Sequence, residues 1–329
     1  MRRIAAAALG LAVGFGVAEA APELKAPTVE EVNGASTVEP RSKGIGAATL
    51  RAQVLLDRLR FSPGVIDGLN GDNFRRARAA FEKANNMATS GDLTKDLLAK
   101  LAQASPEPAL VDYTITDEDV KGPFADVPEE FEDKAKLDRL AFGSAKELLA
   151  EKFHMDEDLL AALNPGRPLD RAGTTIVVAN ITGSEATAAK PTKVGKIEVD
   201  KGDRQVRAVA EDGTILAVYP ASVGSKAKPA PSGTHSVRAI APNPTYTYDP
   251  EYGFKGVKAK EKFEIKPGPN NPVGSTWIDL SVESYGIHGT PEPALVGKAA
   301  SHGCVRLTNW DAEELAQMVR KGTPVTFID

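Results

Sequence analysis

The chain has 329 residues, of which 42% are hydrophobic and 26% are charged. This length suggests about two or three domains, each with its own core. The formal net charge of −5 argues against a nucleic-acid-binding protein, which normally carries a basic face. Aromatic content of only 6% argues against a large stacking surface.

Residues 1–20 have the pattern of a secretory signal peptide. A positively charged start is followed by an apolar stretch over residues 4–17 and by the small-residue cleavage site Ala18-Glu19-Ala20. The apolar stretch is shorter than the about 20 residues of a membrane span; an uncleaved anchor is the alternative. We therefore expect an exported protein of the periplasm or cell wall, without a stable membrane span after cleavage.

Residues 21–49 lack a sustained hydrophobic period and predict a flexible leader. Residues 50–103 predict three short helices, because apolar side chains recur at helical spacing and Asn, Asp and Thr residues stand at N-cap positions. This segment resembles the small helical peptidoglycan-binding domain, through Gln53, Leu56, Leu59, Ile66-Asp67-Gly68, Gly71, Ala77, Ala80-Phe81, Asn85 and Gly91. The resemblance implies glycan binding; a helical adaptor without a ligand is the alternative.

Residues 111–182 predict a strand, two helices and a closing strand. The two helices, at 144–152 and 156–163, each follow an N-cap residue, and an acidic insertion at about 126–138 precedes them. Asn164-Pro165-Gly166 breaks the chain before the closing strand. The arrangement with this exit resembles a LysM carbohydrate-binding module, and a structural spacer is the alternative.

Strands dominate residues 193–329, so a mainly-β domain is expected. Two β segments flank the turn Asp212-Gly213, a strong hairpin signal. A helix that is capped by Asn309 or Asp311 and runs to Arg320, followed by a final strand, closes the domain. The stretch 241–274 is rich in Pro, Gly, Asn and Tyr, and we expect it to form a lid or binding loop.

Cys304 is the only cysteine of the chain. In an exported protein a single thiol is an intermolecular partner, a buried filler or a reactive group. The neighbouring sequence is Ser301-His302-Gly303-Cys304-Val305-Arg306, with His288 upstream. Imidazole and guanidinium neighbours are expected to lower the thiol pKa and so to favour a reactive thiolate.

Nucleophilic catalysis is one interpretation of this pattern. On an extended segment alternate residues share a face, so His302 and Cys304 can project into one cavity. Gly303 between them allows close approach of a substrate and offers its amide hydrogen to an oxyanion. Arg306 shares the alternation and can pair with a substrate carboxylate. Adjacency alone would make His302 the base.

Two other interpretations compete with catalysis. One is a zinc site of two histidines and the thiolate, completed by Asp279, Asp311 or water. The other is a buried cysteine with satisfied core histidines.

Further segments carry a family resemblance. They are Gly268-Pro269-Asn270-Asn271-Pro272-Val273-Gly274, Tyr285-Gly286-Ile287-His288-Gly289-Thr290, Ser301-His302-Gly303-Cys304-Val305-Arg306-Leu307 and Asn309-Trp310-Asp311-Ala312. With these motifs, residues 193–329 resemble the L,D-transpeptidase catalytic domain, a mainly-β, sandwich-like fold with a C-terminal helix.

The resemblance assigns roles to the motif residues. Cys304 is the implied nucleophile, and His288 the principal proton acceptor and donor, oriented by a backbone carbonyl such as that of Gly289. His302 would shape the site, and the amides of Gly303 and Cys304 would stabilise the oxyanion. Further residues expected to bind the substrate are Ser301, Arg306, Tyr285 and Trp277. No metal and no cofactor are expected.

The implied substrates are peptidoglycan stem peptides and glycan. Cys304 would attack the L,D bond of a donor tetrapeptide, release D-Ala, and pass the acyl group to an amine in a 3→3 cross-link. Carbapenem-type β-lactams are the expected inhibitors. With water or a protein amine as acceptor, the same thioester would make a carboxypeptidase, a cross-link hydrolase or a protein-tethering enzyme. A wall-binding protein with an inactive domain is a third possibility, which the intact motif disfavours.

Overall fold

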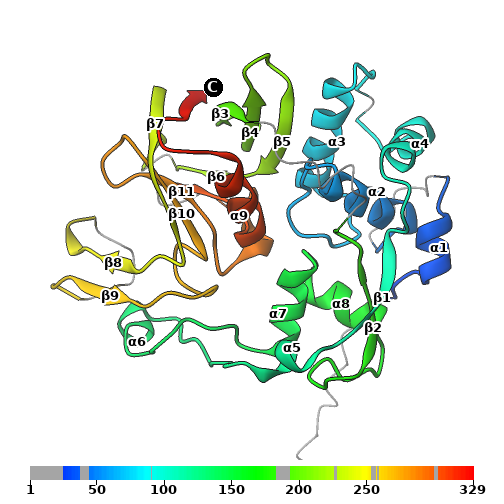
Figure 1. Ribbon diagram of the computed structural model, residues 1–329, viewed down its shortest axis with the longest axis horizontal. Coiled ribbons are helices and arrows are strands. Elements are labelled where there is room, and N and C mark those ends of the chain that lie inside the picture. Colours follow the sequence, from blue (N-terminus) through cyan, green and yellow to red (C-terminus); the bar gives the residue numbers. More distant parts are fainter. Residues whose placement is uncertain are drawn as a thin grey trace, which may run out of the picture.

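The computed structural model describes residues 25–37, 44–89, 91–182, 193–225, 228–252, 257, 259–299 and 303–329 (Figure 1). The expected signal peptide, residues 1–20, lies outside this range. Within the described range, no helix is both long and apolar enough to cross a membrane.

Residues 21–49 were expected to form a flexible leader. This expectation is wrong for residues 29–34, which form the short helix α1 (Val29–Gly34). Thr28 and Glu31 form a capping box that starts the helix. Val32 is fully buried, and the Asn33 side chain exchanges two hydrogen bonds of 2.9 Å with the backbone of Leu110. Helix α1 is therefore fixed to the strand that begins at Leu110.

Three helices follow: α2 (Ala47–Arg58), α3 (Asp72–Ala84) and α4 (Lys95–Ala104). Their apolar faces share one core, to which α2 contributes Leu55 and Leu56 and α3 contributes Phe74 and Phe81. Val218 of the β domain belongs to the same core. The helical unit is therefore packed against the β domain, and its resemblance to a peptidoglycan-binding domain stays a prediction.

The next unit pairs two antiparallel strands, β1 (Leu110–Thr114) and β2 (Thr175–Ala179). Between them lie α5 (Asp117–Lys121), α6 (Phe131–Lys134), α7 (Ala145–Lys152) and α8 (Glu157–Leu163). Asn164 ends α8, and its side chain exchanges hydrogen bonds of 2.7 and 2.8 Å with the backbone of Val177. The Asn164 side chain thus joins the end of α8 to the closing strand β2, which gives the break at Asn164-Pro165 a structural role.

The acidic insertion leaves this unit and crosses to the β domain, where α6 lies beside β8 (Tyr246–Tyr248) and β9 (Phe263–Ile265) (Figure 1). We call residues 123–143 the crossing segment. Phe131 packs its ring against Tyr246 and Tyr248, with centroids 5.8 and 6.4 Å apart. The insertion therefore contributes to the surface of the β domain.

The β domain is one curled sheet with the strand order β5-β4-β3-β13-β7-β10-β11-β12-β6 among the residues described. The strands are β3 (Val194–Asp200), β4 (Gln205–Ala210), β5 (Ile215–Pro220), β6 (Ser222–Val223), β7 (Gly233–Pro242), β10 (Thr276–Leu280), β11 (Gly286–His288), β12 (Val305–Arg306) and β13 (Pro324–Ile328). The two edge strands, β5 and β6, are separated only by Ala221, so the sheet must curl until its edges meet. The mainly-β prediction is confirmed.

Helix α9 (Asn309–Met318) adds Ala312 and Leu315 to the core of the curled sheet. Thr308 is its N-cap, since the hydroxyl accepts a hydrogen bond from the Asp311 amide. The expectation that Asn309 or Asp311 caps this helix is therefore wrong. The side chain of Asn309 instead accepts hydrogen bonds from the amides of Ser275 and Thr290.

The described residues of the stretch 241–274, which was expected to form a lid or binding loop, include regular strands. Its strands β8 and β9 pair antiparallel, and short 3₁₀ turns lie at η1 (Pro250–Tyr252) and, further along the chain, η2 (Pro293–Leu295). The Glu132 carboxylate of the crossing segment accepts a hydrogen bond from the Ala259 amide. Within the stretch, β8 and β9 therefore form a strand pair that the crossing segment contacts, and residues 253–256 and 258 lie outside the described residues.

Candidate active site

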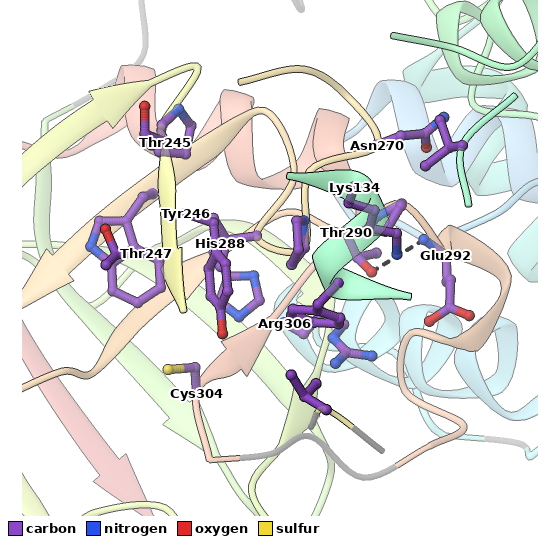
Figure 2. A pocket seen from close by; sticks show the side chains of 18 of the residues that line it. Lys134, Thr245, Tyr246, Thr247, Asn270, His288, Thr290, Glu292, Cys304 and Arg306 are labelled. Atoms are coloured by element: carbon purple, nitrogen blue, oxygen red, sulfur yellow. Dashed lines mark hydrogen bonds between the residues drawn. The ribbon is translucent and has the colours of Figure 1, made fainter. Parts of the chain in front are cut away.

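The parallel pairing of β11 with β12 brings the two motif segments together. Ile287 is opposite Val305, and His288 is opposite Arg306. Ile287 and Val305 are fully buried in the core, so residues at the alternate positions face the other side of the sheet. Cys304, Arg306 and His288 therefore line one cavity, as Figure 2 shows.

His288 is buried and held from two sides. Its Nδ1 lies 2.6 Å from the carbonyl oxygen of Gly289, and its ring stacks on Trp277 with centroids 5.5 Å apart. Burial, reinforced by the charge of Arg306, lowers the pKa of the His288 imidazole to about 4. The ring is therefore neutral near pH 7. Its Nδ1–H donates to the carbonyl, which leaves Nε2 free to accept a proton.

The thiol of Cys304 departs from the expectation. Burial raises the pKa of the Cys304 thiol above its ordinary value. A backbone hydrogen bond from Gly286 and the charges of Arg306 and Lys228 offset only part of this effect. The expected net lowering of the thiol pKa is therefore wrong, because desolvation of the thiolate outweighs its cationic neighbours.

The cavity has a volume of about 1860 Å³. One side carries Gly303, Cys304, His288, Trp277 and Tyr285, and β8 adds Tyr246. Further lining comes from the crossing segment, including Phe131 and Lys134, and from Glu147 of α7. The second unit of the chain thus helps to enclose the motif residues.

Arg306 and Tyr285 present unused donors near Cys304. Among the described residues, neither Arg306 Nε nor the Tyr285 hydroxyl has a hydrogen-bond partner, although both atoms are buried. Buried polar groups are normally paired, so such atoms indicate places for ligand atoms. The Tyr285 ring itself packs edge-on against Phe327 in the core.

The glycine positions of the motif have distinct geometry. Gly303 has a φ of 137°, which residues with a side chain rarely adopt. Gly289 does not line the cavity but lies behind His288, and a Cβ added there would fall 2.2 Å from Asn309 Oδ1. Ser301 and His302 lie outside the described residues, so their expected contributions remain predictions.

The competing interpretations fit less well. Asp279 forms a two-bond ion pair with Arg238, at 2.8 and 3.1 Å. Asp311 accepts a hydrogen bond from Ser62 of the helical unit at 3.1 Å. Both carboxylates offered as a fourth zinc ligand are therefore engaged elsewhere. Cys304 lines a cavity, which disfavours a core filler.

Residues from distant segments were missed by sequence reasoning. Phe131 and Lys228 line the cavity, and Asn309 with Glu151 lies directly behind the His288 loop. The one local signal was the family motif around Asn309. The others depend on contacts between segments that no local pattern reports.

Residues 195–327 match the family model for the L,D-transpeptidase catalytic domain. The chain is 30% identical over 187 residues to the "Putative L,D-transpeptidase YkuD" of Bacillus licheniformis, covering 56% of this chain and 94% of that protein. It is 29% identical over 188 residues to the "Probable L,D-transpeptidase YbiS" of Escherichia coli K12, covering 56% of this chain and 60% of that protein.

Solved structures are also similar. The crystal structure of L,D-transpeptidase 3 from Mycobacterium tuberculosis is 19% identical with a TM-score of 0.34, covering 40% of this chain and 60% of that chain.

Proposed function

Because the chain belongs to the L,D-transpeptidase family, we propose that it is a peptidoglycan L,D-transpeptidase with Cys304 as nucleophile and His288 as base. The observation that carries this proposal is the pairing of β11 with β12, which sets His288 opposite Arg306 and brings His288 and Cys304 into the lining of one cavity. The hydrogen bond from His288 Nδ1 to Gly289 fixes the tautomer that a base needs.

In the first step His288 Nε2 takes the thiol proton while Cys304 Sγ attacks the carbonyl carbon of the L,D bond. The raised thiol pKa and the lowered imidazole pKa keep both groups neutral at rest. The charged pair would therefore form during attack rather than beforehand. Backbone amides around Gly303 and Cys304 stabilise the oxyanion. The C–N bond breaks, D-Ala leaves with the proton from His288, and a thioester remains.

In the second step the side-chain amine of another stem attacks the thioester carbonyl. His288 takes a proton from this amine and returns it to the sulfur as the C–S bond breaks. The product is a 3→3 cross-link, and Cys304 is regenerated. Water at this stage would give hydrolysis instead, so the walls contributed by β8 and the crossing segment favour transfer by limiting water.

We assign recognition of the tetrapeptide substrate to the hydrogen-bond donors of Arg306 and Tyr285 described above. Arg306 and the Tyr285 hydroxyl supply hydrogen bonds for a stem carboxylate. Trp277 supports His288 from behind while also lining the cavity. Ser301 and His302 are proposed to complete the same wall.

We also propose export to the periplasm or cell wall, with residues 1–20 removed. Residues 50–103 and 111–182 would bind peptidoglycan glycan, in keeping with their resemblance to the peptidoglycan-binding and LysM modules. Pull-down of the mature protein on purified sacculi tests this part. Retention by an inert polysaccharide to the same extent would count against specific glycan binding.

The reaction is tested with purified disaccharide-tetrapeptide and product analysis by mass spectrometry. A dimer linked 3→3 supports cross-linking. Tripeptide as sole product would support a carboxypeptidase, and unchanged substrate would refute both. Transfer to an added protein amine would support tethering. A carbapenem should add its mass to the wild-type protein and leave a Cys304→Ala variant unmodified.

A further inference from the structure

Asn309 fastens the backbone beside His288. The side chain is buried, and its Oδ1 accepts hydrogen bonds from the Thr290 amide at 3.0 Å and the Ser275 amide at 3.1 Å. Gly274 and Gly289 pack so closely on this oxygen that an added Cβ would lie 2.1 or 2.2 Å away. Asn309 therefore fixes the loop that contains Gly289.

The same loop sets the orientation of the imidazole. The Gly289 carbonyl receives the Nδ1–H of His288 over 2.6 Å. Movement of the 289–290 backbone would therefore move the acceptor that fixes the ring and its tautomer. Catalytic geometry is sensitive to such shifts, since a displacement of about 1 Å can cost about 100-fold in rate.

Asn309 is in turn held by a residue of the second unit. Glu151, on α7, accepts from Asn309 Nδ2 through both carboxyl oxygens, at 3.2 and 3.0 Å. The remaining contact of Nδ2 is the Pro269 carbonyl, at 3.2 Å. An ionised carboxylate accepts hydrogen bonds and cannot donate them. Glu151 thus requires the amide nitrogen to face α7, which directs Oδ1 toward the two loop amides.

The charge state of Glu151 does not remove this preference. Burial raises the pKa of the Glu151 carboxyl to about 8 against the opposing effect of Asn309, with Glu147 and Glu313 adding to the increase and His154 opposing it. Even when protonated, the carboxyl group keeps one oxygen that only accepts. The Asn309 amide therefore has an acceptor on this side in both states.

We propose that Glu151 is a positioning residue for His288, acting through Asn309 and the Gly289 carbonyl. The unit that resembles a LysM module thereby supplies part of the support for the catalytic base. This inference rests on the proposed role of His288 in the transpeptidase reaction. It adds a function for the second unit besides glycan binding.

The experiment compares four variants of the full mature chain with the wild type. Glu151→Ala removes the acceptor, and Glu151→Asp keeps a carboxyl group but withdraws it by one methylene. Glu151→Gln keeps an oxygen that can accept from Asn309. The matched control is Glu157→Gln on α8, where the same chemical change affects only a partly exposed ion pair with Lys146.

Two rates are measured for each variant: acylation of Cys304 by a carbapenem at saturation, and alkylation by iodoacetamide at alkaline pH. Acylation needs an oriented His288, whereas alkylation of the thiolate needs only access. We expect acylation to fall about tenfold or more in Glu151→Ala and Glu151→Asp. Glu151→Gln should stay within about threefold of wild type, and alkylation should be unchanged in all variants.

The outcomes separate the two proposals. Wild-type acylation rates in Glu151→Ala and Glu151→Asp would overturn the positioning role while leaving the transpeptidase proposal intact. A parallel loss of acylation, alkylation and thermal stability, without rescue by Glu151→Gln, would show a purely structural role and would also overturn it. If Glu151→Ala does not fold, Glu151→Asp still decides. Failure of the wild type to be acylated or to process tetrapeptide would refute the proposed function itself.

Discussion

Replacing Arg306 by Gln is expected to raise the pKa of His288 without restoring its ordinary value. Burial and the Arg306 charge both depress the pKa of the buried imidazole from 6.5 to about 4, and burial is the larger cause. This difference corresponds to about 3 kcal/mol favouring the neutral ring. The hydrogen bond to Gly289 opposes both causes but is smaller than burial. Removal of Arg306 should therefore recover only part of the depression, and the pKa should remain below 6.5.

The sign of the effect on stability follows from the depressed pKa. The folded state prefers the neutral imidazole, so the contribution of His288 is complete above about pH 6.5 and is lost as the pH falls toward 4. In Arg306→Gln this loss should still begin near pH 6.5, but it should be smaller and should be complete at a higher pH, because the folded-state pKa is closer to the unfolded value. In this variant His288 should also become protonated at a higher pH, so activity should be lost at a higher pH on the acidic side of the profile.

The assay is an NMR titration of the imidazole Cε1–Hε1 signals from pH 7.5 to 4. The chain has four histidines, and a His288→Asn variant identifies the signal that belongs to His288. In wild type this signal should stay that of a neutral ring down to about pH 5. A wild-type titration near pH 6.5, or no upward shift in Arg306→Gln, would refute the electrostatic reasoning.

Three further predictions concern the walls and the support of the site. Phe131→Ala should raise KM for the donor tetrapeptide about three- to tenfold, because it removes the ring contacts with β8. Steady-state kinetics measure this, and an unchanged KM would show that the crossing segment does not bind substrate. Gly289→Ala should destabilise the protein by about 2–3 kcal/mol, because the new Cβ would collide with Asn309 Oδ1. Thermal unfolding measures this, and an unchanged Tm would contradict the prediction. Lys228→Ala should move the alkylation profile of Cys304 to higher pH, because the Lys228 charge lowers the thiol pKa; a shift to lower pH would be inconsistent with that charge effect.

Local signals predicted much of the β domain. The Asp212-Gly213 turn indicated a hairpin, and β4 pairs with β5 across it. The alternation of Cys304 and Arg306 indicated a shared face, and both line the cavity. These features depend on neighbouring residues along one strand, so a single segment contains the information.

The features that sequence reasoning missed depend on distant contacts. Glu151 and Asn309 are separated by 158 positions, and no periodicity links α7 to α9. The direction of the thiol pKa shift depends on burial, which arises only when Cys304 packs against the core of the folded sheet. The cap of α9 is a different kind of error, since the Thr308 side chain was overlooked beside two other polar candidates.

The central claim is that Cys304 carries the acyl group, and the intermediate itself tests it. Mature protein is mixed with disaccharide-tetrapeptide without an acceptor, quenched in acid, and analysed by intact mass and peptide mapping. We predict an added mass equal to the donor less D-Ala, located on the peptide that contains Cys304, and none in Cys304→Ala. An adduct on another residue, or D-Ala release by Cys304→Ala at the wild-type rate, would contradict the claim.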